Sequence, residues 1–183
     1  ELKTQGVTPR LEVILVGADK ASATYVRKKG EAAKKIGIDF ELHELPADIS
    51  QDELVDKIYA IQENENLSGL IVQLPLPDHL YTPEVLNAIN PELDVDCLTN
   101  ENLGRLVMKT NWIVPPTPGA VITILHELNA ELIGKNVTII GVGALVGKPL
   151  AIMMMNERAS VTTCNSATKD IKEKCLNSDI IVT

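Results

Sequence analysis

Apolar runs alternate with segments of helical period along the whole chain, and this alternation restricts the fold more than any other feature. Residues 11–17, Leu-Glu-Val-Ile-Leu-Val-Gly, form a short, nearly continuous hydrophobic run that ends in Gly, as expected for a strand buried on both faces. A segment of helical period follows over residues 22–36. Strands that alternate with helices in this way are typical of parallel sheets with crossover helices. The sequence therefore predicts an α/β protein.

The remaining predicted elements continue the same order. Ser50 begins a helix, because its spacing to Glu53 matches a capping box. The strand over residues 69–74 stops before Pro75 and Pro77, which cannot donate to a sheet. We expect further strands over residues 38–45, 136–141, 160–164 and 179–182, and further helices over 118–128, from 147, and in a short segment before the last strand.

The regular periodicity fades between Pro91 and Pro118, and we place the domain boundary there. Residues 1–116 are predicted to form an N-terminal α/β domain with a parallel sheet. Residues 117–183 are predicted to form the first half of a Rossmann-type nucleotide-binding domain. Such a sheet normally continues into a second half, whereas this sequence stops just after a strand, so we expect it to be part of a longer protein.

Charge and composition exclude several classes of partner. Against 25 acidic residues the chain has 17 Lys and Arg, a formal net charge of -8, which disfavours broad binding to nucleic acid or to an anionic membrane. No apolar stretch approaches the length of a membrane span, and residues 1–10 lack the hydrophobic core of a signal peptide. We therefore expect a soluble, cytoplasmic protein. Three widely spaced cysteines and three histidines indicate neither a disulfide framework nor a zinc site.

Two groups of polar residues follow predicted strands in the first half. Tyr25 and Lys29 are four residues apart on the first helix, so their side chains share one face close to the carboxyl end of the first strand. Ligands bind at that end of open α/β sheets. A Lys in such a crevice can transfer protons, although a solvated Lys is the alternative. Gln73 lies at the end of another strand, where it either binds a ligand or caps the strand backbone.

Two alternating carboxylates, Asp94 and Asp96, stand in the loop-rich stretch. Carboxylates in this arrangement often cap turns or face solvent. They are too few, and lack the spaced oxygen ligands, for a calcium loop. Metal binding at this position is therefore not expected, and we expect the protein to carry no metal.

A glycine-rich turn marks the second half. Gly141, Gly143 and Gly147 follow a predicted strand and open a predicted helix, so the backbone amides of this turn can receive a pyrophosphate. The spacing GxGxxxG is one residue longer than the usual fingerprint. The next strand ends at Cys164 and Asn165, where a standard NAD site would offer an acid to the ribose, and Lys169 is the nearest cation.

Together these blocks resemble the methylenetetrahydrofolate dehydrogenase/methenyltetrahydrofolate cyclohydrolase family in order and spacing, over almost the whole chain. The blocks that carry the resemblance lie at residues 22–29 (SATYVRKK), 72–77 (VQLPLP), 94–96 (DVD), 102–106 (NLGRL), 115–118 (PPTP) and 141–149 (GVGALVGKP).

The resemblance implies a folate domain followed by a nucleotide-binding domain, a homodimer, and two reactions in one cleft. The first reaction oxidises 5,10-methylenetetrahydrofolate with NAD(P)+, and the second hydrolyses the methenyl product to 10-formyltetrahydrofolate. By the family's mechanism Asp96 hydrogen-bonds the pterin ring, Tyr25 lies against it, and Lys29, assisted by Gln73, serves the one-carbon bridge. The implied folate-binding residues are Ser22, Tyr25, Gln73, Leu74, Pro75 and Asp96, and the implied cofactor-binding residues are Gly141, Val142, Gly143, Val146, Gly147, Pro149, Asn165, Ser166 and Thr168.

Departures from the family pattern affect mainly the cofactor. Where the family has Gly-Arg-Ser before the helix, this chain has Gly141-Val142-Gly143, and where the family has His-Ser and a basic residue it has Asn165-Ser166-Ala167. Loss of these donors weakens the binding of a 2′-phosphate. We therefore expect NADP, the family's cofactor, to face unusual competition from NAD. Pro116 and Cys97 also replace the family's usual Cys and Gly, but neither change removes a predicted folate-binding group.

Three other readings remain open from the sequence. The chain could be a cyclohydrolase alone or a folate-binding homologue without redox activity, because the cofactor loop is altered. An unrelated Rossmann-type dehydrogenase would leave the Tyr25, Lys29 and Gln73 blocks unexplained.

Overall fold

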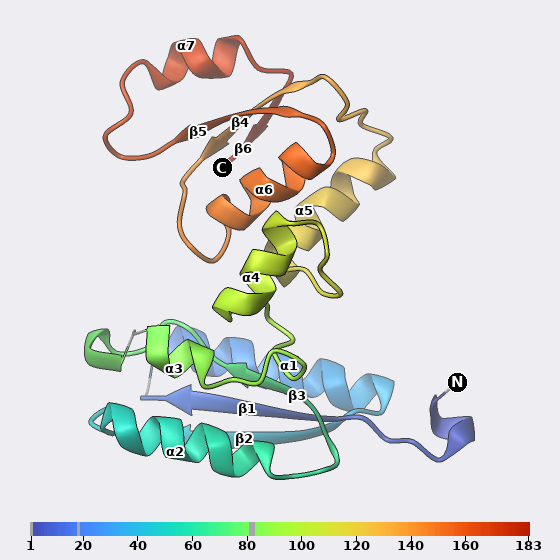
Figure 1. Ribbon diagram of the computed structural model, residues 1–183, viewed down its shortest axis with the longest axis vertical. Helices are drawn as coiled ribbons and strands as arrows, with labels where there is room; N and C mark the ends of the chain where they lie inside the picture. Colours follow the sequence, from blue (N-terminus) through green and yellow to red (C-terminus); the bar gives the residue numbers. More distant parts are fainter. Residues whose placement is uncertain (1, 18, 81–82) are drawn as a thin grey trace. The chain divides into compact units, whose positions relative to one another are not determined.

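The computed structural model describes residues 2–17, 19–80 and 83–183, which form two units, Glu1–Val95 and Asp96–Thr183. Each unit has a three-stranded sheet in which neighbouring strands run parallel (Figure 1). The predicted α/β class is confirmed. Among the described helices, none combines the length and the apolar character needed to cross a membrane.

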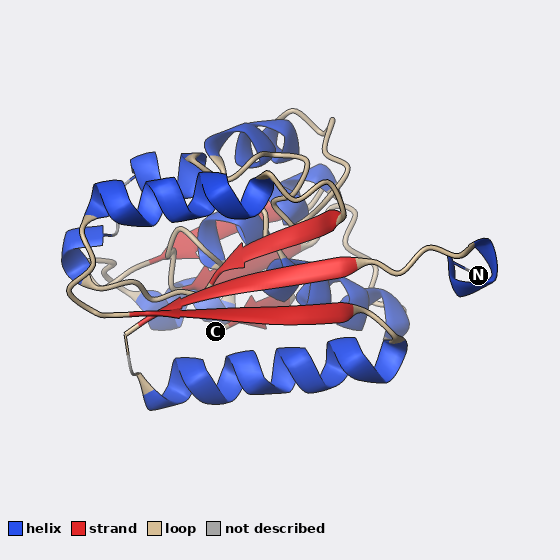
Figure 2. Ribbon diagram, turned by 90° about the horizontal axis from the view of Figure 1, so that it is seen from below, coloured by secondary structure: helices blue, strands red, loops and turns tan. Residues whose placement is uncertain are grey.

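The first unit alternates strands and helices. Its elements are η1 (Leu2–Gln5), β1 (Arg10–Val16), α1 (Lys20–Ile36), β2 (Asp39–Leu45), α2 (Gln51–Gln62), β3 (Leu67–Val72), η2 (Asp78–Leu80) and α3 (Pro83–Asn87). The strand order is β2-β1-β3, so β1 is central. Figure 2 shows helices on both faces of this sheet.

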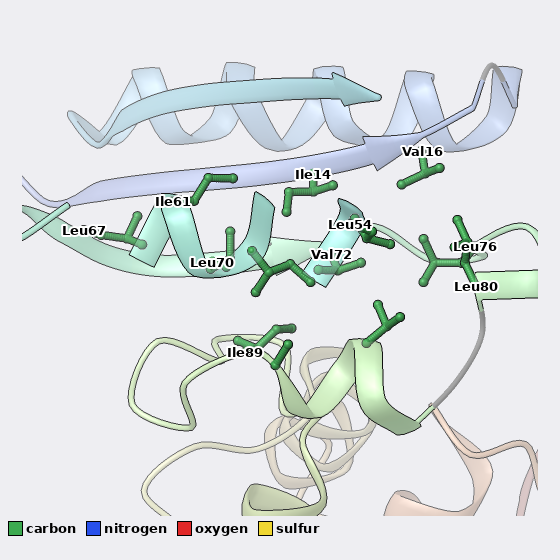
Figure 3. Close-up of a cluster of buried hydrophobic side chains, with 13 residues drawn as sticks. Ile14, Val16, Leu54, Ile61, Leu67, Leu70, Val72, Leu76, Leu80 and Ile89 are labelled. Carbon is green, nitrogen blue, oxygen red and sulfur yellow. The ribbon is translucent and has the colours of Figure 1, made fainter. Parts of the chain in front are cut away.

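The two faces of β1 pack against different helices because side chains alternate along a strand. Val13 and Leu15 contact Val26 of α1 on one face. Ile14 and Val16 point to the other face, into the larger core that α2 and α3 cover. Figure 3 shows this larger core, whose side chains come from the sheet, from α2 and from the segment after β3. Burial on both faces explains the nearly continuous apolar run of β1.

The second unit repeats this alternation around its own core. Its elements are α4 (Asn100–Val107), α5 (Pro116–Glu127), β4 (Asn136–Ile140), α6 (Gly147–Asn156), β5 (Ser160–Cys164), α7 (Ile171–Leu176) and β6 (Ile180–Val182). The strand order is β5-β4-β6. Leu150 and Met154 of α6 are buried against Val137 and Ile139 of β4, and Leu106 of α4 belongs to the same core.

Several boundaries differ from the predicted ones. The first helix begins at Lys20, because Asp19 rather than Ser22 is its N-cap. The strand before Pro75 ends at Val72, so Gln73 lies just beyond it. Helices α3 and α4 were not expected, because the loop-like composition of residues 83–107 obscures short helices.

The contacts divide the chain at Val95 and Asp96, earlier than the predicted boundary at residue 116. The reason is α4, whose amphipathic face buries Leu106 in the second core. The segment 96–116 therefore packs with the second unit. The division of function at residue 116 stays a prediction.

Candidate functional site

The first turn of α1 is held by a side-chain cap. The Asp19 carboxylate accepts a hydrogen bond of 2.6 Å from the backbone N–H of Ser22, and this bond lowers the pKa of Asp19. Ser22 itself is buried at the start of the helix. The cap thus fixes the beginning of the helix that carries three of the predicted folate-site residues.

Tyr25 and Lys29 meet on one face of α1, as predicted. The Lys29 Nζ atom lies 5.4 Å from the centre of the Tyr25 ring, within the range of a cation–π contact. The Tyr25 side chain is 58% exposed. An exposed aromatic ring beside an ammonium group can pack against a flat ligand while the ammonium donates to it.

Gln73 follows β3 and is nearly buried. Its backbone N–H donates to Ile14 O at 2.9 Å, and its side-chain Nε2 donates to Leu74 O at 2.6 Å. The Oε1 atom is buried and has no hydrogen-bond partner within the described residues. A buried acceptor without a donor costs about 1 to 3 kcal/mol. This oxygen is therefore suited to accept a hydrogen bond from a group that is not part of the described chain.

The two groups of residues share one edge of the sheet. Because β1 and β3 are parallel neighbours, the loops that follow them leave the sheet at the same, carboxyl, edge. Ser22 and Tyr25 follow β1, while Gln73, Leu74 and Pro75 follow β3. The fold thus brings together residues that are 48 or more positions apart, as the sequence analysis anticipated for ligand binding at strand ends.

Asp94 and Asp96 differ in their surroundings. Asp94 is fully buried, and its backbone forms an isolated parallel β-bridge with Leu70 of β3. The alternative interpretation, in which this carboxylate faces solvent, is therefore wrong for Asp94. Asp96 is half-buried and follows two residues later. The bridge at Asp94 anchors the chain beside β3 immediately before Asp96.

The predicted cofactor residues meet at the carboxyl edge of the second sheet. β4 and β5 are parallel neighbours, with Ile140 opposite Cys164, so the turn at 141–147 and the loop at 165–168 leave the sheet side by side. Gly141 donates from its N–H to Cys164 O at 2.8 Å. Its φ of 99° lies in the region that favours glycine. Pro149 is buried in the first turn of α6.

The turn before α6 has backbone amides for a pyrophosphate. The helix N-cap, Val146, provides no side-chain hydrogen bond. The Lys148 N–H donates to Gly143 O at 3.0 Å, and Pro149 has no N–H. The amides left for a ligand are therefore those of Gly147 and the preceding turn. Gly147 packs so closely that a Cβ there would lie 1.9 Å from Gly141 O. A Cβ at Gly143, in contrast, would meet no atom within 4 Å, which leaves the turn open beside the helix. These are the features that a phosphate-binding turn requires.

Hydrogen bonds within the loop after β5 fix its shape. Asn165 N–H donates to Thr168 Oγ1 at 2.8 Å, and Ala167 N–H donates to Asn165 Oδ1 at 2.9 Å. Ser166 and Lys169 are exposed. The Oδ1 atom of Asn165 therefore shapes the loop, and the side-chain donors that remain for a ribose or its phosphate are Asn165 Nδ2 and those of Ser166 and Lys169.

Two features of the first unit were missed by sequence reasoning. A cavity of about 460 Å³ lies between α1 and β2, and none of the predicted site residues lines it. A polar cluster of Glu12, Glu41 and His43 lies on the paired strands β1 and β2. No spacing rule connects β1 to β2, so neither feature could be found without the fold.

Known proteins resemble both halves of the chain. Residues 1–96 match the family described as tetrahydrofolate dehydrogenase/cyclohydrolase, catalytic domain, and residues 115–183 match its NAD(P)-binding domain. The "Bifunctional protein FolD" of Helicobacter hepaticus is 46% identical over 180 residues, which cover 98% of this chain and 63% of that protein. The chain thus spans just under two thirds of the length of such relatives.

Solved structures extend the likeness to three dimensions. The bifunctional enzyme FolD from Campylobacter jejuni superposes with a TM-score of 0.95 at 37% identity, over 100% of this chain and 65% of that one. The dehydrogenase-cyclohydrolase from Trypanosoma brucei, solved with NADP and an inhibitor, gives a TM-score of 0.93 at 38% identity, over 98% and 62%.

Proposed function

The chain belongs to the tetrahydrofolate dehydrogenase/cyclohydrolase family, and from this premise we propose that it acts on one-carbon tetrahydrofolates. The proposed activities are oxidation of 5,10-methylenetetrahydrofolate with NAD(P)+ and hydrolysis of the methenyl product to 10-formyltetrahydrofolate. Relatives named for both activities support the proposal.

The observation that carries the proposal is the buried Oε1 atom of Gln73, which has no donor among the described residues. It lies after β3, at the edge of the sheet from which the α1 segment with Tyr25 and Lys29 also begins. A folate offers N–H donors and a flat ring system. The unsatisfied acceptor, the exposed ring and the ammonium group match these two properties.

The proposed roles are those that the family resemblance implies, and the chemistry of each side chain agrees with its role. Tyr25 packs against the pterin ring, and Asp96 accepts hydrogen bonds from its N–H groups. Lys29 transfers a proton at the one-carbon bridge, and Gln73 assists Lys29 in this role. Ser22, Leu74 and Pro75 complete the wall of the folate site. NAD(P) supplies the hydride acceptor, held by the turn from Gly141 to Gly147.

Replacement of Lys29 tests the assignment. We expect Lys29→Ala to lower cyclohydrolase kcat about 100-fold or more, the usual scale of a lost acid–base group, with Lys28→Ala as the control on the same helix. Absorbance of the methenyl compound measures the hydrolysis. Normal hydrolysis by Lys29→Ala would remove Lys29 from the mechanism. A wild-type protein that hydrolyses no methenyltetrahydrofolate and reduces no NAD(P)+ would refute the proposed function itself.

For the cofactor, we propose that NAD competes with NADP more strongly than the family pattern implies. Val142 replaces the family's Arg, and neutral Asn165 stands in place of the family's His, so a 2′-phosphate would rely on Asn165, Ser166, Lys169 and backbone amides. Dehydrogenase kcat/KM for the two cofactors measures this choice. A strong preference for NADP would contradict the proposal.

We further propose a homodimer, as the family resemblance implies, and a location in the cytoplasm, as expected from the sequence. In the described chain β2 pairs only with β1. The cavity beside β2 is lined by apolar side chains, among them Phe40 and Leu42, and by charged side chains of both signs. A second copy could match these charges by symmetry. Sedimentation equilibrium of wild type and Leu42→Glu tests this: a monomeric wild type would refute the dimer, and an unchanged variant would refute the surface. Cell fractionation tests the compartment.

A further inference from the structure

A polar cluster lies on the paired strands β1 and β2 of the first unit, on the sheet face that carries Ile14. Glu12 of β1 lies opposite Glu41 of β2, and the next pair on the same face is Ile14 and His43. Ile14 belongs to the core under α2. The cluster therefore continues the face of that core, whereas the proposed folate residues lie beyond the carboxyl ends of the strands.

Three donor atoms of the cluster converge. His43 Nε2 lies 2.7 Å from Glu12 Oε2 and 3.9 Å from Glu41 Oε1, and the donor atoms all lie within 4.8 Å of one another. Two donors bound to one tetrahedral ion at about 2.1 Å are about 3.4 Å apart. The two distances to His43 bracket this value, and the carboxylate oxygens of Glu12 and Glu41 lie within 4.8 Å of each other, so shifts of up to about 1 Å in each side chain would bring the three donors to this spacing.

Arg10 binds the carboxylate oxygens of Glu12 and Glu41 that do not face His43. Its Nε donates to Glu12 Oε1 at 2.7 Å, and its Nη2 donates to Glu41 Oε2. Asn64 also donates to Glu12 Oε1, at 3.2 Å. Each carboxylate is thus bound at one oxygen, and its second oxygen faces His43. Groups behind metal ligands in proteins orient carboxylates in this way.

Charge and access also suit a cation. Two carboxylates and one guanidinium leave a net charge of -1 when the imidazole is neutral, so a divalent ion is attracted despite Arg10. The Glu12 side chain is 4% exposed and that of His43 is 15%, whereas that of Glu41 is 46%. The cluster is therefore buried on one side and open on the other, where an ion can enter and water can complete its coordination.

We propose that Glu12, Glu41 and His43 form a binding site for a divalent transition-metal ion of the Zn²⁺ class. An imidazole nitrogen suits Zn²⁺ and Co²⁺, whereas Ca²⁺ and Mg²⁺ require six or more oxygen ligands. On binding, the ion takes the place of the proton between His43 Nε2 and Glu12 Oε2, and the neutral imidazole then carries its single proton on Nδ1, so no net proton is released. The bound ion would join the edge strand β2 to the central strand β1. The absence of a zinc motif in the sequence is consistent with this, because the ligands come from two separate strands.

Metal titration of the purified protein tests the site. We expect wild type to bind one equivalent of Zn²⁺ by calorimetry and to give the visible absorption of four-coordinate Co²⁺. His43→Gln and Glu41→Gln should each weaken Zn²⁺ binding at least about tenfold, because even the loss of a group behind the ligands costs about 10- to 100-fold. His126→Gln is the matched control, because His126 faces a single carboxylate, Glu157, at 3.9 Å and should leave the affinity unchanged.

Other results would overturn the site. A wild type without saturable Zn²⁺ binding, equal binding of Ca²⁺, or an unchanged affinity in Glu41→Gln would each do so. If His43→Gln does not fold, the decision rests on Glu41→Gln, because the Glu41 side chain is nearly half exposed. Zn²⁺ should also raise the Tm of wild type and not that of Glu41→Gln, since only a folded site binds the ion. Both activities of the proposed folate site should be the same in wild type and Glu41→Gln, so this test is independent of the proposed function.

Discussion

Glu12 is the buried carboxylate on which the polar cluster depends. Burial alone would raise its pKa, but hydrogen bonds from Arg10, His43 and Asn64 outweigh burial and hold the pKa below its ordinary value. A carboxylate whose pKa is lowered by folding stabilises the folded state when it is ionised. Its contribution is complete above the pKa of the unfolded chain and is lost as the pH falls through the lowered pKa of the folded state.

Replacement of Glu12 should reveal this contribution through its pH dependence. We expect Glu12→Gln to be less stable than wild type by an amount that is constant above about pH 5 and shrinks below about pH 4, because the wild-type carboxylate then takes up its proton. Urea unfolding at a series of pH values in a metal-free buffer measures the difference. The exposed Glu65→Gln serves as control. A Glu12→Gln deficit that stays constant down to pH 3 would contradict the assignment.

Cys97 is one of the departures from the family pattern, and its backbone conformation shows what the change costs. Its φ is 56°, a left-handed conformation that costs a residue with a Cβ about 1 to 2 kcal/mol. The family commonly has Gly at this point, where no such cost arises. The Cys side chain is buried, so its packing offsets part of the strain.

At the scale of elements, the turn from β4 into α6 depends on the third glycine of its motif. A Cβ at Gly147 would lie 1.9 Å from Gly141 O and 2.8 Å from the Cα of Val142, so the helix could not approach the turn. All of these neighbours are backbone atoms, which cannot rotate away as a side chain can. This close approach accounts for glycine at position 147 independently of any ligand.

Gly147→Ala should therefore destabilise the second unit. We expect a loss of about 1 to 3 kcal/mol in the free energy of unfolding, the usual cost of forcing extra atoms into a packed region. Gly143→Ala is the matched control in the same turn, because its Cβ would meet nothing within 4 Å. Urea unfolding compares the variants. If the two variants have the same free energy of unfolding, the turn accommodates the added Cβ at position 147 without loss of stability, and the prediction is wrong.

Elements with local signals were predicted well. The Ser50 and Glu53 side chains form the predicted capping box, and the bond from Ser50 lowers the pKa of Glu53. Helix α4 was missed, although its N-cap Thr99 accepts a hydrogen bond from Asn102 N–H at 3.2 Å. The amphipathic face of α4 stabilises the helix because Leu106 on this face packs into the second core. Short helices of this kind depend on packing more than on their own propensity.

At the scale of the whole molecule, the two units have separate cores. Leu54 is fully buried in the core beneath β1 and β3, and Met154 is fully buried in the core beside β4. Large-to-small substitutions in such positions cost about 2 to 5 kcal/mol. The separation of the cores leads us to expect that each unit opens as its own cooperative unit.

Hydrogen exchange should show this separation. We expect Leu54→Ala to accelerate amide exchange in β1 and β3 more than in β4, and Met154→Ala to do the reverse, because each removes contacts from one core. Peptide-level mass spectrometry provides the measurement, and each variant is the control for the other. Equal acceleration in both sheets by either variant would show that the units unfold together.

The sequence by itself determined the features that depend on neighbours along the chain. The apolar run of β1, the capping box at Ser50, the turn from Gly141 to Gly147 and the pairing of Tyr25 with Lys29 all follow from spacings of a few residues. The α/β class and the alternation of strands and helices along the chain follow from the same periodicities. The ordered blocks also identified the family.

Only the tertiary structure decided which distant residues meet. It placed Gln73 at the same sheet edge as the start of α1 and left the Oε1 atom of Gln73 buried without a donor in the described chain. It buried Asp94, and it brought Glu12 against His43, 31 residues away. The physical reason is that strand order and register fix these neighbours. Neither is encoded in local spacing, because both arise from how whole elements pack together.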